Sequence, residues 1–221
     1  MRREVLAADL EKLYSANDMV KIGCGGCRGC CDCCTGMGES IVLDPLDVWR
    51  LEKGLDTGFA GLMERFVELH PVDGILLPNL RMEGEAEKCP FLNEEKRCAI
   101  HAFRPGLCRL FPLGRIYENG SFRYFIQQQE CPVQPKTKVK ISKWLDIGQL
   151  AQYETFVLQW HNLLEETGAM AEAQKDEQLT RDLNVYLLES FYQKPYDGRD
   201  FYVQFEERLQ YMRKLLKILG R

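Results

Sequence analysis

The first hydrophobic pattern along the chain is helical. Val5, Leu6, Leu10 and Leu13 recur at the spacing of one helix face, with charged residues between them. This pattern predicts a short amphipathic helix over residues 3–15, which leads toward a segment rich in cysteine.

The next apolar segments alternate between strand and helix signals. A continuous apolar run at residues 41–43 predicts a strand. Asp44 followed by Pro45 predicts a helix start, because aspartate caps helix N-termini and proline suits the first helical position. That helix should end near Lys53, and a second amphipathic helix is predicted over residues 58–69.

The middle of the chain favours extended structure. The run at residues 75–80 is apolar but contains Pro78, so we expect an edge strand or an extended loop rather than a central strand. Farther on, the segments 114–117 and 122–128 flank an Asn-Gly pair at 119–120. Asn-Gly adopts the tight turn of a two-residue hairpin, so these segments predict a β-hairpin.

The last third of the chain contains no cysteine and reads as helical. Its leucine and aromatic positions predict three helices, near residues 141–166, 173–193 and 199–219. Gly168, Pro195 and Gly220 stand where these helices should end. Trp144 and Trp160 fit the core of such helices better than a cofactor site.

Together these elements predict an α+β protein that is mostly α. Residues 1–140 should form an irregular, cysteine-organised metal-binding module with short strands and a β-hairpin. Residues 141–221 should form a C-terminal helical part. The predicted boundary rests on the point where the cysteines end and long helical periodicity begins.

Composition places the chain among ordinary folded proteins. Of its 221 residues, 45% are hydrophobic and 28% are charged, which is enough to bury a core. The formal net charge of -4 argues against a general nucleic-acid binder. Asp9, Glu11 and Lys12 interrupt the N-terminal segment, so it resembles neither a secretory signal nor a membrane span. We expect a cytoplasmic protein that binds neither nucleic acid nor membranes.

Cysteine is the most unusual feature of the composition. Six of the ten cysteines lie between Cys24 and Cys34, separated by glycines and charged residues rather than by an apolar repeat. Glycine permits the tight turns that direct two sulfurs at one ion. In a reducing cytosol this pattern favours a metal site, although the even number of cysteines also suits a disulfide framework.

The first cluster has two interpretations. In one, Cys24, Cys27, Cys30 and Cys34 match the bacterial ferredoxin spacing C-x2-C-x2-C-x3-C, which holds iron–sulfur clusters. Thr35 rather than proline follows the last of them, and the chain has no second copy of the run. A complete ferredoxin domain is therefore not expected.

The other interpretation joins this cluster to motifs farther along the chain. In order, these motifs are Cys89-Pro90-Phe91-Leu92, Cys98-Ala99-Ile100-His101, Arg104-Pro105, Cys108-Arg109-Leu110-Phe111-Pro112 and Cys131-Pro132. Over residues 23–135 the series resembles the YkgJ-like cysteine-cluster family, a zinc- or iron-chelating domain named for a CxxCxxxCC signature. The chain has two residues between Cys30 and Cys33, where the family's name implies three.

The resemblance implies a metal centre held by thiolates. The candidate ligands are the eight cysteines at family positions, namely Cys27, Cys30, Cys33, Cys34, Cys89, Cys98, Cys108 and Cys131. About four thiolates serve a zinc ion or a cubane, so eight could supply two sites or one site with spare thiols. Extended backbone would point Cys33 and Cys34 in different directions, so we expect them not to serve one ion equally. Cys24 and Cys31 are additional to the family pattern.

The expected function is therefore the binding of zinc or an iron–sulfur cluster, with no activity specified. One alternative is a redox or protein-modifying enzyme, for example one with a lysine methylase-like activity, that uses the cluster beside Arg104 and Arg109. Another is an interaction module with purely structural zinc, whose C-terminal helices bind a protein partner. If the protein is an enzyme, its metal should have an open coordination position. If the site is structural, four protein ligands should fill the coordination of the metal.

The residues around the second cysteine region could have either functional or ordinary structural roles. His101 follows Cys98 by three residues and could act as a nitrogen ligand or a base, but the thiols suffice without it, which favours a packed histidine. Arg104, Arg109 and Arg115 could bind an anionic substrate or balance thiolate charge. Pairing with local carboxylates or carbonyls is their ordinary role.

Overall fold

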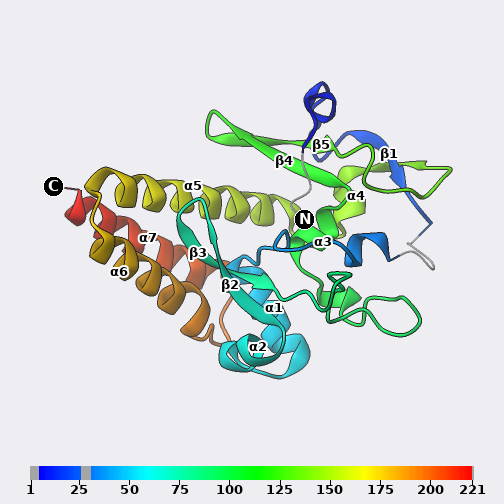
Figure 1. The fold of residues 1–221 in the computed structure, drawn as a ribbon. Coiled ribbons are helices and arrows are strands. Elements are labelled where there is room, and N and C mark those ends of the chain that lie inside the picture. Colours follow the sequence, from blue (N-terminus) through cyan, green and yellow to red (C-terminus); the bar gives the residue numbers. More distant parts are fainter. Residues whose placement is uncertain (1–4, 26–30, 221) are drawn as a thin grey trace. The chain divides into compact units, whose positions relative to one another are not determined.

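The computed structural model describes residues 5–25 and 31–220, which form an α+β fold that is mostly helical (Figure 1). Short antiparallel strand pairs and turns lie among the cysteines, and long helices follow them in the sequence. The predicted fold class is confirmed. None of the helices formed by the described residues has the length and apolar content needed to cross a membrane.

The chain divides into two compact units. The first, here called the cysteine unit, comprises residues 1–42 and 80–150, and the second, the helical unit, comprises residues 43–79 and 151–221. Residues 43–79 group with the C-terminal helices because α1 and α2 both contact the turn η4 of that region. The predicted boundary near residue 140, drawn from cysteine content and helical periodicity, stays a prediction.

The cysteine unit is built from short elements. They are η1 (Ala7–Leu10), β1 (Met19–Gly23), η2 (Asp32–Cys34), η3 (His101–Phe103), α3 (Gly106–Leu110), β4 (Leu113–Glu118), β5 (Ser121–Ile126), β6 (Thr137–Lys140) and α4 (Ile141–Leu145). The 3-10 turns η1, η2 and η3 are only three or four residues long. Elements this short do not stabilise themselves, so the unit depends on the contacts between them.

The predicted hairpin is present. Strands β4 and β5 pair in antiparallel register from Leu113 opposite Ile126 to Glu118 opposite Ser121. The turn residues at positions 119–120 have φ values of 52° and 69°, which is the left-handed geometry that an Asn-Gly turn provides.

A second strand pair, which the hydrophobic pattern did not lead us to predict, closes the core of this unit. Strand β1 pairs antiparallel with β6, with Val20 opposite Val139. The buried side chains of β1 then join a small hydrophobic core made of Val20, Ile22, Leu110, Leu113, Tyr124, Ile141 and Leu145. This core supports α3 and α4, the two helices that border the cysteine site.

The predicted helix over residues 3–15 is wrong for the part that is described. Only the single 3-10 turn η1 forms, and the chain then extends so that Tyr14 pairs with Tyr124, its N–H donating to the Tyr124 carbonyl over 2.8 Å. Asp18 accepts a hydrogen bond from the Ser15 N–H at 2.7 Å and so closes a turn before β1. Pairing with a distant strand overrides the local helical pattern here.

The helical unit contains the longer elements. They are α1 (Pro45–Leu55), α2 (Phe59–Arg65), β2 (Val67–Val72), β3 (Ile75–Leu80), α5 (Leu150–Gln174), α6 (Glu177–Leu188), the π-helical turn η4 (Glu189–Gln193) and α7 (Phe201–Leu219), with β3 and α5 each having one end residue in the cysteine unit. The predicted start of α1 is confirmed, since the Asp44 carboxylate accepts from the Asp47 N–H at 2.8 Å. The predicted strand at 41–43 is reduced to isolated backbone hydrogen bonds, such as that from the Leu43 N–H to the Pro78 carbonyl at 2.8 Å.

The helix predicted over residues 58–69 is too long. Helix α2 ends at Arg65, and β2 begins at Val67 and pairs with β3. Asp73 and Gly74, with φ values of 50° and 83°, make the two-residue turn that joins these strands. The predicted edge strand at 75–80 is confirmed as β3 of this two-stranded sheet.

The C-terminal helices are confirmed in kind but not in their bounds. The predicted helix 141–166 is interrupted, because α4 ends at Leu145 and Asp146 takes a left-handed φ of 51°. Gly168 does not end a helix and instead lies within α5, where a Cβ would stand 3.5 Å from the Asp73 carbonyl oxygen. Gly220 caps α7, as predicted.

Aromatic side chains fill the core of the helical unit. The rings of Phe156 and Phe205 meet edge to face with centroids 4.6 Å apart, and Trp160, Phe191 and Phe201 surround them. All five side chains are almost fully buried. Such pairs add packing energy to a large buried area, so this unit has an independent hydrophobic core.

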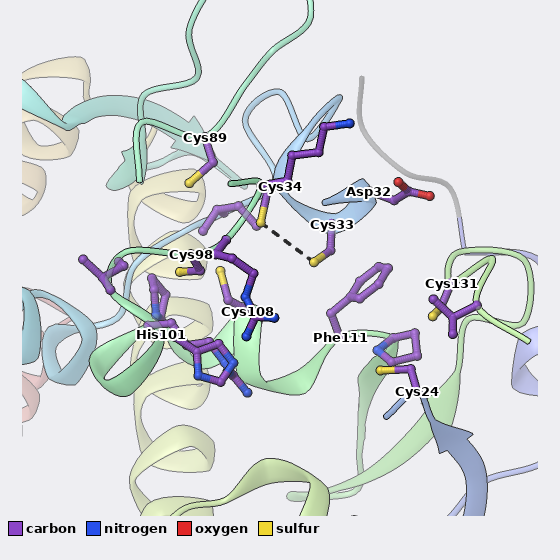
Figure 2. A pocket seen from close by; sticks show the side chains of 18 of the residues that line it. Cys24, Asp32, Cys33, Cys34, Cys89, Cys98, His101, Cys108, Phe111 and Cys131 are labelled. Atoms are coloured by element: carbon purple, nitrogen blue, oxygen red, sulfur yellow. Dashed lines mark hydrogen bonds between the residues drawn. The ribbon is translucent and has the colours of Figure 1, made fainter. Parts of the chain in front are cut away.

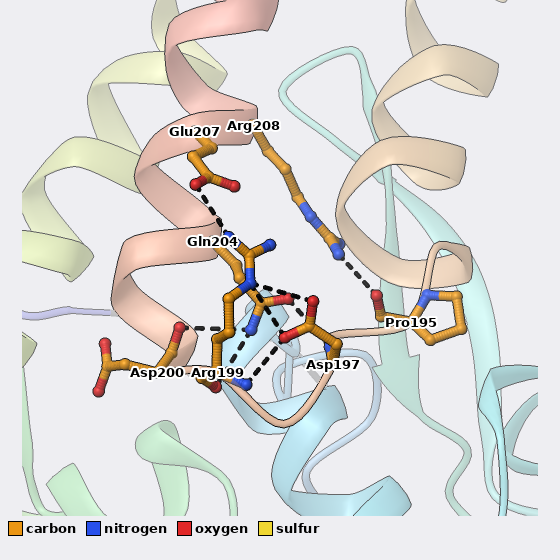
Figure 3. A network of polar contacts seen from close by, with 7 residues as sticks. All are labelled: Pro195, Asp197, Arg199, Asp200, Gln204, Glu207 and Arg208. Carbon is orange, nitrogen blue, oxygen red and sulfur yellow. Dashed lines mark hydrogen bonds and ion pairs between the residues drawn. The ribbon is translucent and has the colours of Figure 1, made fainter.

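A polar network fixes the link between η4 and α7 (Figure 3). Arg199 forms ion pairs with Asp197 at 3.0 Å and with Glu207 at 3.1 Å. Gln204, nearly fully buried, accepts from the Asp197 N–H and donates to the Arg199 carbonyl. Arg208 donates to three backbone carbonyls, one within η4 and two in the residues that follow it. The link is therefore held by side-chain hydrogen bonds rather than by regular structure.

Candidate metal centre

The first cysteine pair lies on the 3-10 turn η2, which carries Cys33 and Cys34. The turn is joined to the second cysteine region by the backbone, since the Cys34 carbonyl accepts from the Cys89 N–H at 2.8 Å. The Gly36 N–H donates to the Ala86 carbonyl at 3.1 Å and extends this connection. Backbone hydrogen bonds thus bring together cysteines that are far apart in sequence.

Cys89 and Cys98 lie at the two ends of a closed loop. Leu92 and Cys98 form an isolated β-bridge, and the Ala99 N–H donates to the Phe91 carbonyl at 2.8 Å. The N–H groups of Phe91 and Ile100 donate to the sulfurs of Cys89 and Cys98, respectively, and each hydrogen bond lowers the pKa of its thiol. Such N–H donors stabilise the thiolate form, which is the form that binds metals.

Cys108 is held by α3, and Arg109 anchors that helix. The buried Arg109 guanidinium donates to the carbonyls of Ala102, Arg104 and Asp146, the last two at 3.3 Å. The ordinary interpretation of Arg109, pairing with local carbonyls, therefore holds. The hydrogen bonds of Arg109 connect α3, which carries Cys108, to η3 and to the end of α4.

The cysteines of the described chain converge on a cavity of about 310 Å³ within the cysteine unit. Seven of them line it: Cys24, Cys33, Cys34, Cys89, Cys98, Cys108 and Cys131. Figure 2 shows the sulfurs of five of these, Cys33, Cys34, Cys89, Cys98 and Cys108, in one group, here called the five-thiol group. Cys24 and Cys131 lie beyond the ring of Phe111.

Interactions within the five-thiol group shift its ionisation. The Cys33 and Cys34 sulfurs are 4.0 Å apart, and their hydrogen bond, together with burial and the charges of nearby thiols, raises the pKa of Cys34. Burial, with smaller contributions from neighbouring thiols, raises the pKa of Cys89 to about 11 and also raises that of Cys98. Without a cation these thiols would remain protonated at neutral pH.

Residues 26–132 match the family model described as "CxxCxxCC: Putative zinc- or iron-chelating domain". This segment, 107 of the 221 residues, is similar to the domain that the family model describes. The resemblance suggested by the ordered cysteine motifs is thereby confirmed, and metal binding is the property that the family's description names. No curated protein and no solved structure matched the chain.

The chemistry of the cysteine-lined cavity fits a thiophilic metal centre. Zinc and iron–sulfur clusters are held by thiolates, and the cavity gathers thiols with N–H donors to two of them. A divalent cation would reverse the raised thiol pKa values, because coordinated thiols lose their protons. Within residues 5–25 and 31–220, no group of three or more histidine, cysteine, aspartate or glutamate side chains forms a ready-made metal site.

The structure places the predicted ligands unequally. Cys27 and Cys30 lie outside the described residues. Cys33 and Cys34 lie on a 3-10 turn rather than on extended backbone, and both line the same cavity. That they do not serve one ion equally stays a prediction. Cys131 lies apart from the five-thiol group, so its role as a ligand stays a prediction.

Two residues that line this cavity are not among the eight candidate ligands named from the family motifs. Cys24, which is additional to the family motifs, lines the cavity at the end of β1, whereas Cys31 does not. Trp144, assigned to the core from helical spacing, also borders the cavity from α4. The alternating apolar positions of β1, with Val20 and Ile22 buried, are a signal that could have placed Cys24 at the end of a strand.

Proposed function

We propose that this protein binds zinc or an iron–sulfur cluster through the thiolates of the five-thiol group. The observation that supports the proposal is the gathering, in one cavity, of thiols from η2, the 89–98 loop and α3. Buried thiols that repel one another when ionised need a cation to balance them. A soft, thiophilic metal is the cation that thiolates select.

The same arrangement supports a role in stability. The ligands come from segments joined mainly by loops, so a shared metal would cross-link elements that pack around only a small core. A structural zinc site is worth roughly 10 to 16 kcal/mol of apparent binding free energy. This is comparable with the roughly 5 to 15 kcal/mol that stabilises a whole domain.

The test is the metal content of protein purified without oxygen. Zinc, iron and acid-labile sulfide are measured together with the visible spectrum for the wild type and for Cys34→Ser, with Cys31→Ser as the matched control. Cys34 belongs to the five-thiol group, whereas Cys31 does not line the cavity. We expect Cys34→Ser to lose most of the metal and Cys31→Ser to retain it.

Two results would oppose the proposal. A wild type that binds neither metal after anaerobic reconstitution would remove its basis. Full retention of metal by Cys34→Ser and by a second variant, Cys108→Ser, would show that the centre lies elsewhere. Iron with stoichiometric sulfide identifies a cluster, and colourless zinc protein identifies a zinc site.

A redox or protein-modifying enzyme is the second candidate, because the cavity extends beyond the thiols to Phe111 and Trp144. A closed structural site has no need of such space. A coloured centre that bleaches on reduction would favour this candidate. An interaction module whose C-terminal helices bind a protein remains the third prediction.

A further inference from the structure

The cavity beside the five-thiol group has a cationic wall. The cationic side chains among its described lining residues are Lys96, Arg97, Arg104 and Lys143. Two carboxylates, Asp32 and Asp146, also face it, so positive charge predominates in a chain whose net charge is -4. Lys96, Arg97 and Lys143 are exposed, whereas Arg104 is partly buried. The cavity therefore has three exposed cations and one that is partly buried.

Arg104 differs from Arg109 in how its nitrogens are used. Three nitrogens of Arg109 donate to backbone carbonyls, so its role is structural. The Nε of Arg104 is buried and has no hydrogen-bond partner among the described residues. A buried donor without an acceptor costs about 1 to 3 kcal/mol, so it points to an acceptor that arrives with a ligand.

His101 leaves the charge of Arg104 available. Its Nε2 accepts a hydrogen bond from Nη1 of Arg104. Burial, together with the positive charges of Arg104, Arg109 and Arg97, lowers the pKa of His101. The imidazole is therefore neutral at neutral pH, so it orients the guanidinium without neutralising it.

The cavity also has an apolar wall, to which Phe111 and Trp144 contribute. Trp144 donates from Nε1 to the Phe111 carbonyl at 3.1 Å, which fixes its ring beside the cavity. Figure 2 shows Phe111 and His101 among the side chains around the thiols. A volume of about 310 Å³ is at the small end of the range for small-molecule sites.

We propose that this cavity binds a small organic anion. Its carboxylate or phosphate group accepts hydrogen bonds from Arg104, and its apolar body packs against Trp144 and Phe111. The site uses none of the thiols as contacts, so it goes beyond the proposed metal function and can be tested apart from it. It also places the ligand in the cavity that the five-thiol group lines.

The test uses phenylphosphate as the probe and titration calorimetry on the full-length protein as purified. Benzyl alcohol tests the apolar wall alone, and inorganic phosphate tests the cationic wall alone. We expect phenylphosphate to bind more tightly than either, and its binding to weaken as salt is added. The Arg104→Gln variant should lose on the order of tenfold in phenylphosphate affinity, because a charge-assisted acceptor pair is removed.

Two further variants keep the result interpretable. Lys143→Gln removes an exposed cation of the cavity without disturbing a buried contact, and should weaken phenylphosphate by about threefold. Lys138→Gln removes the same charge from β6, outside the cavity lining, and should leave binding unchanged. If Arg104→Gln does not fold, Lys143→Gln against Lys138→Gln still decides the question.

Metal content is measured on every sample, so a failure of the proposed anion binding can be distinguished from a failure of the proposed metal binding. Phenylphosphate binding that is absent from the wild type, no stronger than that of benzyl alcohol, or unchanged in both cavity variants would overturn the anion site. Loss of metal from Arg104→Gln with unchanged phenylphosphate binding would also overturn it, and would assign Arg104 to balancing thiolate charge. Weakened phenylphosphate binding in the cavity variants, with metal content unchanged, supports the proposal.

Discussion

The two units of this protein reach stability by different routes. The helical unit buries an aromatic core in which Phe205 packs against both Phe156 and Trp160. The cysteine unit packs short strands and turns around a small aliphatic core with one buried tyrosine, and places thiols where further apolar packing could have been. Under the proposed metal binding, the difference is that one region has its own large core and the other depends also on what its side chains bind.

Removing the metal should have the largest effect on this contrast. Chelation under reducing conditions should abolish amide-exchange protection in the β4–β5 hairpin and in α4, while α5 and α7 stay protected. The expected loss is of the order of the roughly 10 to 16 kcal/mol that a structural thiolate site contributes. Hydrogen exchange with and without metal makes the measurement. Equal loss in both units, or none in the cysteine unit, would contradict the comparison.

A cavity in the aromatic core should have the next largest effect. Phe205→Ala removes a ring that is 1% exposed, and should destabilise the helical unit by about 3 to 5 kcal/mol. Urea unfolding followed by circular dichroism gives the value, and metal content should not change. Tyr211→Ala, at a position 66% exposed on the same helix, is the control and should stay within about 0.5 kcal/mol of wild type. Metal loss from Phe205→Ala would argue that the units are not separate in stability.

Weakening the support of α3 in the cysteine unit should have the third largest effect. Arg109→Lys cannot reproduce three directed hydrogen bonds to carbonyls, and should destabilise that unit by about 2 kcal/mol and weaken metal retention at Cys108. Arg123→Lys is the matched control, since the contacts of Arg123 with the carbonyls of Leu13 and Tyr14 are exposed and 3.4 Å long. Metal retention in rising chelator concentrations compares the two. The idea of Arg109 as an anchor fails if both variants behave alike.

The smallest effect concerns one carboxylate of the helical unit. Burial raises the pKa of Glu52 above its ordinary value of 4.5, so the folded state favours its protonated form. This stabilisation is fully present below the unfolded pKa and is lost as the pH rises through the folded pKa. Glu52→Gln should therefore be more stable than wild type at pH 7 by less than about 1 kcal/mol, and no more stable near pH 4.

Urea unfolding at the two pH values measures this difference. Glu172→Gln, at an exposed position of α5, serves as the control and should change stability at neither pH. A gain for Glu52→Gln that persists at acid pH would show that its origin is not the ionisation of Glu52.

Local signals predicted the parts of the fold whose geometry depends on neighbours in sequence. Asp44 and Pro45 start α1 because the cap hydrogen bond spans only three residues. The Asn-Gly pair makes the β4–β5 turn because its preferred φ values suit that turn. The N-terminal helix was predicted by the same kind of signal and is wrong, because Tyr14 pairs with Tyr124, far away in sequence.

Some features of the candidate site were likewise predictable from local sequence, and others were not. Cysteine spacing and the ordered motifs were enough to predict the family resemblance that the match over residues 26–132 confirms, because thiols this dense serve no packing purpose. Only the tertiary structure decided that Cys33 and Cys34 face one cavity, that Cys131 lies apart from them, and that Arg109 is structural whereas Arg104 faces the cavity. These outcomes depend on backbone pairing and burial between segments distant in sequence, and no local pattern encodes such contacts.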